Sequence, residues 1–469
     1  MTPPQGRGDP APCPPPHRER DRLGDGLWAA TLIWIVGMAT VFPLGNDALE
    51  AVSVFTFDRI AFLAVAALLM LVIARTPAML HRWGRVEVMM ALYLAVVVVS
   101  WTMTLPEKHA VDMKRDVDLL LTSFLMPYTA FVIARYCGWS RWQVRTAAWV
   151  IVAGVGAFLI AVGLVQGLID WRFLVSEAHQ AVHRSRARGS FPNALPYAVL
   201  LALLVPIALA LRVHDARRTR RVLLVVLCAG LLEALLLSQI RIVWIALPAA
   251  LLYCAAVCPP TRRAAVLSGV ALLTAIALAS GGMDLRLISR ADGALVQLPG
   301  GVGQRMVDSW PVYDRVAVYA TALNMIAHRP LLGFGFGTRT FERWRGAYLT
   351  SCCGVSPDYA AECAVPHNEL LNVLVLLGAV GLAAYLGLLR ELWRLLSAGR
   401  AAPADPDRAI LAAGVQTGFV LLVITAQLHD VMYLSSVQVL FFFFVGLVAP
   451  LAIGAGERAA AAPGERGSR

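Results

Sequence analysis

Charged residues are scarce in this sequence, and lysine is almost absent. Only 15% of the 469 residues are Asp, Glu, Lys or Arg, whereas 58% are hydrophobic. A soluble chain has roughly 25% charged and 45–50% apolar residues, so ordinary soluble, disordered, fibrous and disulfide-scaffold proteins are excluded. The composition indicates an integral membrane protein.

Arginine supplies nearly all of the positive charge, because lysine occurs only at Lys108 and Lys114. The 41 basic residues exceed the 30 acidic ones and give a formal net charge of +11. In a soluble protein this excess would favour nucleic-acid binding. In a membrane protein arginines that flank the spans explain it first, so we expect no nucleic-acid partner.

Several motifs of enzyme chemistry are also missing. The sequence contains no HExxH motif, no Walker phosphate-binding loop and no paired CxxC. Asp116 and Asp118 form an acidic pair that could hold a metal ion, but the adjacent Lys114 and Arg115 favour charge pairing. We therefore predict no metal site and no cofactor.

A glycine-rich stretch, Gly333-Phe334-Gly335-Phe336-Gly337, resembles a nucleotide-binding loop. No strand precedes it and no Lys-Ser/Thr follows it, so that interpretation has little support. A flexible loop that lines a lipid or sugar groove is the favoured alternative.

Apolar runs long enough to cross a bilayer recur along the chain, since a span needs about 20 residues at a rise of 1.5 Å each. We predict an all-α polytopic membrane protein with about twelve transmembrane helices. The predicted spans are 27–45, 59–74, 86–105, 117–136, 144–169, 194–212, 222–238, 242–258, 264–282, 367–389, 408–427 and 431–454. Only Gln239-Ile240-Arg241 separates the runs at 222–238 and 242–258, so a re-entrant hairpin or one broken helix is an alternative there.

The placement of arginine predicts the orientation. If the N-terminus is cytoplasmic, all five short loops on the inner side are basic, which is the positive-inside pattern. The chain then divides into a disordered cytoplasmic tail, nine spans, a large outer loop with amphipathic helices, three further spans and a second cytoplasmic tail. The corresponding ranges are 1–26, 27–282, 283–366, 367–454 and 455–469.

Some arginines fall on the outer side, where they do not help orientation. They are Arg172, Arg184, Arg186, Arg188, Arg241 and Arg315. A guanidinium near the membrane is costly unless it is paired or hydrated, and a local ion pair is one explanation. The other is a binding site for an anionic group such as a phosphate or pyrophosphate.

His367 lies where the outer loop runs into the span at 367–389. Its ordinary pKa of about 6.5 suits a general base, although its position alone favours a capping or packing histidine. In the same loop Cys363 follows Cys352 and Cys353 closely. In an oxidising compartment we expect a disulfide between Cys363 and either Cys352 or Cys353.

Four short motifs occur in the order that is seen in the O-antigen ligase family, and Gly378 and Gly381 follow the last of them. The motifs are Arg188-Gly189-Ser190-Phe191-Pro192-Asn193, Ser238-Gln239-Ile240-Arg241, Pro330-Leu331-Leu332-Gly333-Phe334-Gly335 and Pro366-His367-Asn368-Glu369-Leu370-Leu371. The chain resembles this family over roughly 185–385. The family also includes O-antigen polymerases and bacterial protein O-oligosaccharyltransferases.

The resemblance implies a multi-pass enzyme of the bacterial inner membrane, with its large loop and active site on the periplasmic side. Its fold would be similar to that of polytopic lipid-sugar transferases of the GT-C type. O-antigen ligases move a glycan from undecaprenyl pyrophosphate to a sugar hydroxyl of the lipid A–core, within membrane lipid and without a metal.

By the same resemblance the essential histidine of the family corresponds to His367, and its essential arginines to Arg241 and Arg315. Arg186 or Arg188 would be a further contact to the donor pyrophosphate. The sequence departs from the family where Ile242-Val243-Trp244 follows Arg241, because small residues are common there. That departure leaves the role of Arg241 open.

Three function classes remain at this stage: the ligase, a related polymerase or protein O-glycosylase, and a non-enzymatic transporter of the lipid-linked glycan. A transporter would place charges near the middle of the bilayer. Apart from Arg59 and Glu233 the span interiors are nearly free of charge, which favours chemistry at the membrane surface. The sequence does not identify the acceptor.

Overall fold

The structure is a computed structural model that describes residues 22–43, 56–76, 83–137, 139–175, 186–282, 310–352, 360, 363–401 and 406–461. Within these residues a helix occupies each of the predicted spans. The helices are α1 (Arg22–Ala39), α3 (Phe57–Arg75), α4 (Arg85–Thr104), α5 (Ala110–Leu120), α6 (Met126–Tyr136), α7 (Arg141–Trp149), α8 (Gly156–Leu168), α9 (Ala194–His214), α10 (Arg218–Leu237), α11 (Arg241–Val257), α12 (Arg262–Gly282), α16 (Glu369–Arg400), α17 (Pro406–Ala426) and α18 (Ser435–Ala461).

Seven helical segments in the described part of the chain are long and apolar enough to cross a membrane. They are α3, α4, α5 with α6, α7 with α8, α9, α16 and α17, where single π-helical turns join the paired helices. The chain is therefore a multi-pass helical membrane protein. The total of twelve spans and the orientation stay predictions.

The uncertain stretch at 222–258 forms two helices rather than one. Gln239, in the left-handed region at φ 55°, turns the chain between α10 and α11. The indole N–H of Trp244 on α11 donates to the carbonyl of Leu235 on α10 at 3.1 Å, which satisfies a carbonyl at the helix end. The turn therefore puts Arg241 at the first residue of α11.

The helix α9 forms the centre of the bundle, and its apolar window is entirely buried. It packs against α10 and α17, while α18 packs against α6. On α17, Gly414 approaches so closely that a Cβ there would lie 2.9 Å from the carbonyl oxygen of Pro206. Since lipid gives helices no hydrophobic reason to associate, such close packing of small residues holds the bundle together.

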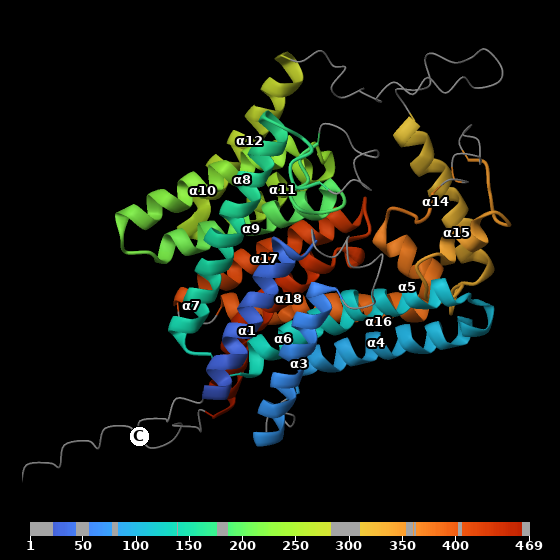
Figure 1. Ribbon diagram of the computed structural model, residues 1–469, viewed down its shortest axis with the longest axis horizontal. Helices are drawn as coiled ribbons and strands as arrows, with labels where there is room; N and C mark the ends of the chain where they lie inside the picture. The colour runs from blue at the N-terminus through green and yellow to red at the C-terminus, as the bar shows by residue number, and fades with distance from the viewer. Residues whose placement is uncertain are drawn as a thin grey trace, which may run out of the picture.

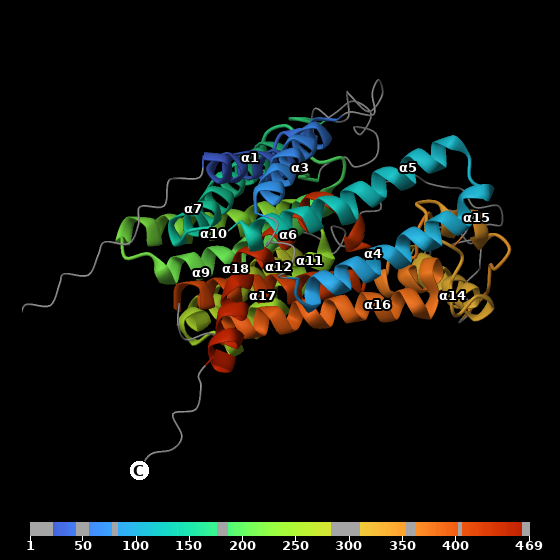
Figure 2. The same ribbon diagram turned by 90° about the horizontal axis from the view of Figure 1, so that it is seen from below.

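Two further helices, α14 (Trp310–His328) and α15 (Thr340–Arg345), lie at one end of the paired helices α4 and α16 (Figures 1 and 2). They share a small apolar core that includes Val318, Met325, Phe334 and Phe341. The core also contains Val375 of α16, so α14 and α15 pack directly against a helix that is long and apolar enough to cross a membrane.

The glycine-rich motif joins α14 to α16 at a break in the second helix. At Gly378 the backbone leaves the helical conformation with φ 61°. The amides of Phe334 and Gly335 donate to the carbonyls of Val375 and Leu376 at 2.8 and 2.9 Å. In return the amide of Ala379 donates to the carbonyl of Pro330 at 2.8 Å.

These bonds satisfy the backbone groups that the break would otherwise expose, as a membrane helix requires. Glycine is needed on both sides, because a Cβ on Gly333 or Gly378 would lie 2.6 or 2.3 Å from the opposite backbone. The motif does line a cavity of about 350 Å³ with Val96, Val99 and Leu377, but these hydrogen bonds fix it in place.

Candidate functional site

The two residues that follow His367 fix the position of the chain at the start of α16. The side chain of Asn368 caps α16 by accepting from the amide of Leu371 at 3.0 Å. It also donates to the carbonyl of Gln427 at 2.8 Å. The carboxylate of Glu369 accepts from the amides of Val431 and Met432 at 2.9 and 3.2 Å. Asn368 and Glu369 thus tie the start of α16 to the connection between α17 and α18.

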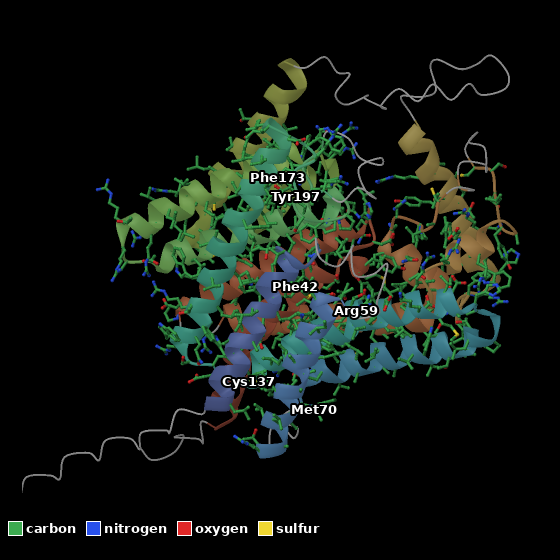
Figure 3. All side chains as sticks on the ribbon, viewed as in Figure 1. Phe42, Arg59, Met70, Cys137, Phe173 and Tyr197 are labelled. Carbon is green, nitrogen blue, oxygen red and sulfur yellow. The ribbon has the colours of Figure 1, made fainter. Side chains whose placement is uncertain are left out.

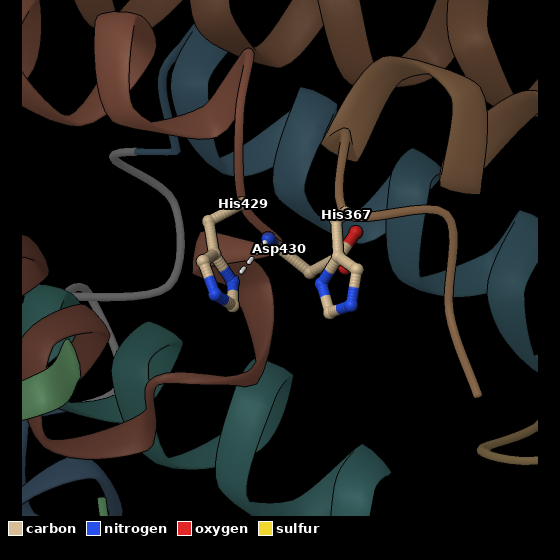
Figure 4. Close-up of side chains that lie close together, drawn as sticks. All are labelled: His367, His429 and Asp430. Carbon is tan, nitrogen blue, oxygen red and sulfur yellow. Dashed lines mark hydrogen bonds between the residues drawn. The ribbon is translucent and has the colours of Figure 1, made fainter. Parts of the chain in front are cut away.

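This connection brings His429 and Asp430 to His367 (Figure 4). The two imidazole rings meet edge to face with their centroids 5.1 Å apart. One ligand-type atom from each of the three residues lies within 4.8 Å of the others. The amide of Asp430 donates to Nδ1 of His429 at 3.2 Å. His367 itself has φ 53°, an uncommon left-handed conformation of a kind often found at functional sites.

Burial decides the protonation of this group. It lowers the pKa of His367, and the positive charge of Arg315 lowers it further. It lowers the pKa of His429 to about 4, with added effects of His367 and Arg315. Both imidazoles are therefore neutral near pH 7. A neutral imidazole can accept a proton, as a general base must.

Asp430 is 3% exposed, and burial raises the pKa of its carboxyl to about 7, with a further contribution from Glu369. The amide of His367 and the side chain of Asn372 lower that pKa somewhat. Within the described residues, however, neither carboxylate oxygen has a hydrogen bond of normal geometry. Nδ1 of His367 is also buried and likewise makes no hydrogen bond of normal geometry.

The structure brings two of the predicted site residues together. Arg315, half-buried on α14, is close enough to His367 and His429 for its charge to act on both rings. The hydroxyl of Tyr319, one turn further along α14, donates to the carbonyl of His367 at 3.5 Å. The joint between α14 and α16 at Gly378 holds these two helices in register.

The other three predicted arginines form a second group around the turn between α10 and α11. The side chain of Gln166 accepts from the amides of Arg188 and Gly189 at 2.8 and 2.9 Å. The amide of Ala187 donates to the carbonyl of Leu237 at 3.0 Å, so this loop rests on the end of α10. Arg241 is exposed at the start of α11.

Arg186 and Arg188 differ sharply in exposure. Arg186 is half-buried, whereas Arg188 is only 1% exposed and donates from Nη1 to the carbonyl of Pro192 at 3.2 Å. The guanidinium of Arg188 therefore lies inside the protein, where it braces the loop that carries the motif 188–193.

A cavity of about 580 Å³ lies between the motif at 188–193 and the connection that carries His429 and Asp430. Its described lining includes none of the predicted site residues His367, Arg315, Arg186, Arg188 and Arg241. Phe191 and Asn193 line it from the arginine loop, and His429 and Asp430 line it opposite. Arg59 and Phe42, both labelled in Figure 3, also line it, and Arg59 pairs with Asp118 at 3.3 Å. This volume lies within the range of small-molecule sites, which is about 300–1,000 Å³.

The acidic pair is used for charge pairing, as the sequence favoured, although its partners are more distant than Lys114 and Arg115. Asp116 binds the ammonium of Lys108 at 2.6 Å and the amide of Thr338 at 2.7 Å. Asp118 binds Arg59. The two carboxylates thus serve separate ion pairs.

The structure also shows what the sequence analysis missed. His429 and Asp430 stand in the short outer connection at 428–430, on the side of the membrane that we predicted for His367. A histidine and an aspartate between two apolar runs were the available indication. Cys352 and Cys363 are half-buried and Cys353 lies outside the described residues, so the disulfide stays a prediction.

Comparison with known families gives one finding. Residues 226–386 match the family model described as O-antigen ligase. The matched segment runs from α10 into α16 and contains Arg241, Arg315 and His367. A search of curated proteins found no match.

Proposed function

We propose that this protein transfers a glycan from undecaprenyl pyrophosphate to a sugar hydroxyl of the lipid A–core, which completes lipopolysaccharide. The match of residues 226–386 to the O-antigen ligase family model supports the proposal. The observation that supports the proposal is a neutral His367 within reach of the charge of Arg315 and next to His429 and Asp430. His429 and Asp430 line a cavity of about 580 Å³, and Arg59 and Arg115 line the same cavity.

In the reaction the acceptor hydroxyl oxygen attacks the anomeric carbon while the bond from that carbon to the pyrophosphate oxygen breaks. His367 takes the hydroxyl proton, and the electron pair leaves with the pyrophosphate. A single displacement inverts the anomeric centre. Once His367 is protonated, the carboxylate of Asp430, which has a ligand-type atom within 4.8 Å of the ring, stabilises the charge.

Arginine meets the charge that builds on the leaving pyrophosphate. Its planar guanidinium can donate two parallel hydrogen bonds to phosphate oxygens. We assign this role to Arg315 and Arg241, with Arg186 as a further donor contact. Arg188 is instead assigned to holding the loop, because its side chain is buried and bonded to Pro192.

The proposal includes the placement of the enzyme. Both termini would be cytoplasmic and the site periplasmic, in the bacterial inner membrane, with a GT-C-like arrangement of spans. The polyprenyl tail of the donor would lie in membrane lipid against the helices. No cofactor or metal is required, because the donor already carries its leaving group.

Transfer from purified lipid-linked glycan to lipid A–core tests the proposal. His367→Ala should reduce the rate by about 10²–10⁴-fold, the usual contribution of a general base, while the variant stays folded. Wild-type transfer by His367→Ala would remove the base assignment. Transfer should survive EDTA.

A deletion strain separates the ligase from its relatives. Loss of all polymer on the core, with lipid-linked polymer accumulating, is expected for the ligase. A core that carries a single repeat unit would instead identify a polymerase. Intact lipopolysaccharide together with a loss of protein-linked glycan would identify a protein O-oligosaccharyltransferase.

A further inference from the structure

Two nitrogen donors and one oxygen donor converge beside the cavity. His367 comes from the loop before α16, and His429 and Asp430 come from the connection between α17 and α18. Their ligand atoms all lie within 4.8 Å of one another. Two imidazoles and a carboxylate with an open fourth position are a donor set that suits Zn²⁺.

We propose that His367, His429 and Asp430 form a binding site for a divalent transition-metal ion, best matched by Zn²⁺, and that an ion bound there blocks transfer. The binding site rests on geometry alone. The block also depends on the proposed function, since it assumes that His367 is the base.

The spacing is close to that of a bound ion. Zinc lies about 2.0–2.2 Å from imidazole nitrogen and carboxylate oxygen, which puts tetrahedral donor atoms about 3.3–3.6 Å apart. Donors spread over at most 4.8 Å can reach this separation through small side-chain rotations.

The donor atoms also have unused capacity. Within the described residues, both oxygens of Asp430 and Nδ1 of His367 are buried and make no hydrogen bond of normal geometry. A buried polar atom that makes no hydrogen bond is costly, and a cation would supply the missing partner. The bonds of Asn368 to Gln427 and of Glu369 to Val431 hold the two loops together, so the site is largely formed beforehand.

Two features of the structure should weaken the binding of a metal ion at this site, and each can be tested by substitution. The charge of Arg315 reaches both histidines and repels a cation. The amide of Asp430 donates to Nδ1 of His429 at 3.2 Å, a long bond that an ion at this nitrogen would displace. Removal of the arginine charge should therefore strengthen metal binding, whereas removal of a donor should weaken it.

Zinc bound at this site would occupy a lone pair of the base. His367 could then no longer accept the proton of the acceptor hydroxyl, and the ion would stand at the wall of the substrate cavity. The site would make the enzyme sensitive to free zinc on the side of the membrane where it works.

The binding test uses the full-length protein in lipid nanodiscs, treated with EDTA and freed of it, and titrated with Zn²⁺ against a chromophoric chelator. We expect one tight site per chain. Asp430→Asn and His429→Gln should each weaken binding by about 100-fold or more, because even residues around the ligands contribute 10–100-fold. Arg315→Gln should tighten it by up to about tenfold.

His328→Gln is the matched control, since His328 is an exposed histidine on α14 away from this group. It should keep the wild-type affinity for Zn²⁺. Absence of a tight site in the wild type, or wild-type affinity in Asp430→Asn, would overturn the proposal. If Asp430→Asn or His429→Gln does not fold, Co²⁺ bound to the wild-type protein is used in place of that variant, and its visible absorption spectrum is recorded. A spectrum without imidazole ligation would count against the site.

Activity separates this proposal from the proposed function. Zn²⁺ should inhibit transfer by the wild type, and EDTA should restore it. Stimulation by Zn²⁺ would refute the block. If His367→Ala transfers glycan normally while the titration still finds the site, the proposed function fails and the metal site stands.

Discussion

Glu369→Ala should disable the enzyme although Glu369 need not touch a substrate. The side chain is 3% exposed, and its carboxylate accepts hydrogen bonds from the amides of Val431 and Met432 and from the hydroxyl of Tyr385. Alanine would leave three buried donors without an acceptor. Because each hydrogen bond to a charged group contributes about 1.5–3 kcal/mol, we expect a loss of about 3 kcal/mol or more in unfolding free energy.

The functional loss should exceed what stability explains. The carboxylate fixes the chain at 431–432, immediately after His429 and Asp430, so its removal lets these residues move away from His367. Glu369→Gln keeps one acceptor oxygen and should be intermediate. Glu391→Ala, on the same helix, removes only a partly exposed pair with Arg394 and should cost about 0.2–1 kcal/mol.

Thermal unfolding in nanodiscs and transfer by folded protein measure the two effects. The expected order of both is wild type, Glu391→Ala, Glu369→Gln, Glu369→Ala. If Glu369→Ala melts with the wild type and transfers glycan at the same rate, the anchoring role assigned to this carboxylate is wrong.

Three further changes test other parts of the structure. Arg188→Ala should lower the melting temperature, because a buried guanidinium is lost from the loop at 188–193. Arg186→Ala should leave the melting temperature unchanged and raise the KM for the donor. Equal melting curves of the two variants would contradict this division of roles. Arg315→Lys and Arg241→Lys should transfer poorly, since lysine keeps the charge but not the fork that grips two phosphate oxygens; full activity of both would reduce the arginines to generic charge. In intact cells a cysteine placed at Ala347 should react with an impermeant reagent and one placed at Ala216 should not; the reverse pattern would invert the proposed topology.

Asp215 gives the one pH prediction. Burial raises the pKa of this carboxyl, but the amide of Arg217, the side chain of Arg145 and the charge of Arg220 outweigh burial and lower it overall. The folded pKa is thus below the unfolded value of about 3.9, so its contribution to stability is present above about pH 4 and is lost as the pH falls through the folded pKa. Melting curves of the wild type and Asp215→Asn should differ at pH 6 and converge in acid.

The sequence predicts the helices well because the bilayer fixes their length. Each apolar run that met that length became a helix, including the pair around Gln239 whose separation was in doubt. The resemblance assigned Arg315 and His367 to one site, and the charge of Arg315 does reach the ring of His367, although the roles of both residues stay predictions. These predictions depend on composition along the chain and on resemblance, which both leave traces in consecutive residues.

For His429 and Asp430 the sequence offered only their position between two apolar runs, and it gave no indication of their contact with His367. Their contact with His367 depends on bonds from Asn368 and Glu369 to residues about sixty positions further along the chain. No periodicity encodes a pairing at that separation. The role of Gly333 was missed for the same reason: its need for glycine comes from the backbone of Leu376, across the joint with α16.

The motif His367-Asn368-Glu369 therefore combines a proposed catalytic residue with two structural residues. Only the imidazole faces the other two members of the histidine–aspartate group, while the next two side chains bind the connection between α17 and α18. Loss of activity in a variant of Asn368 or Glu369 would consequently say little about proton transfer. If such a variant regains activity at lowered temperature, its defect is structural. A catalytic defect at His367 should instead persist at every temperature at which the protein is folded.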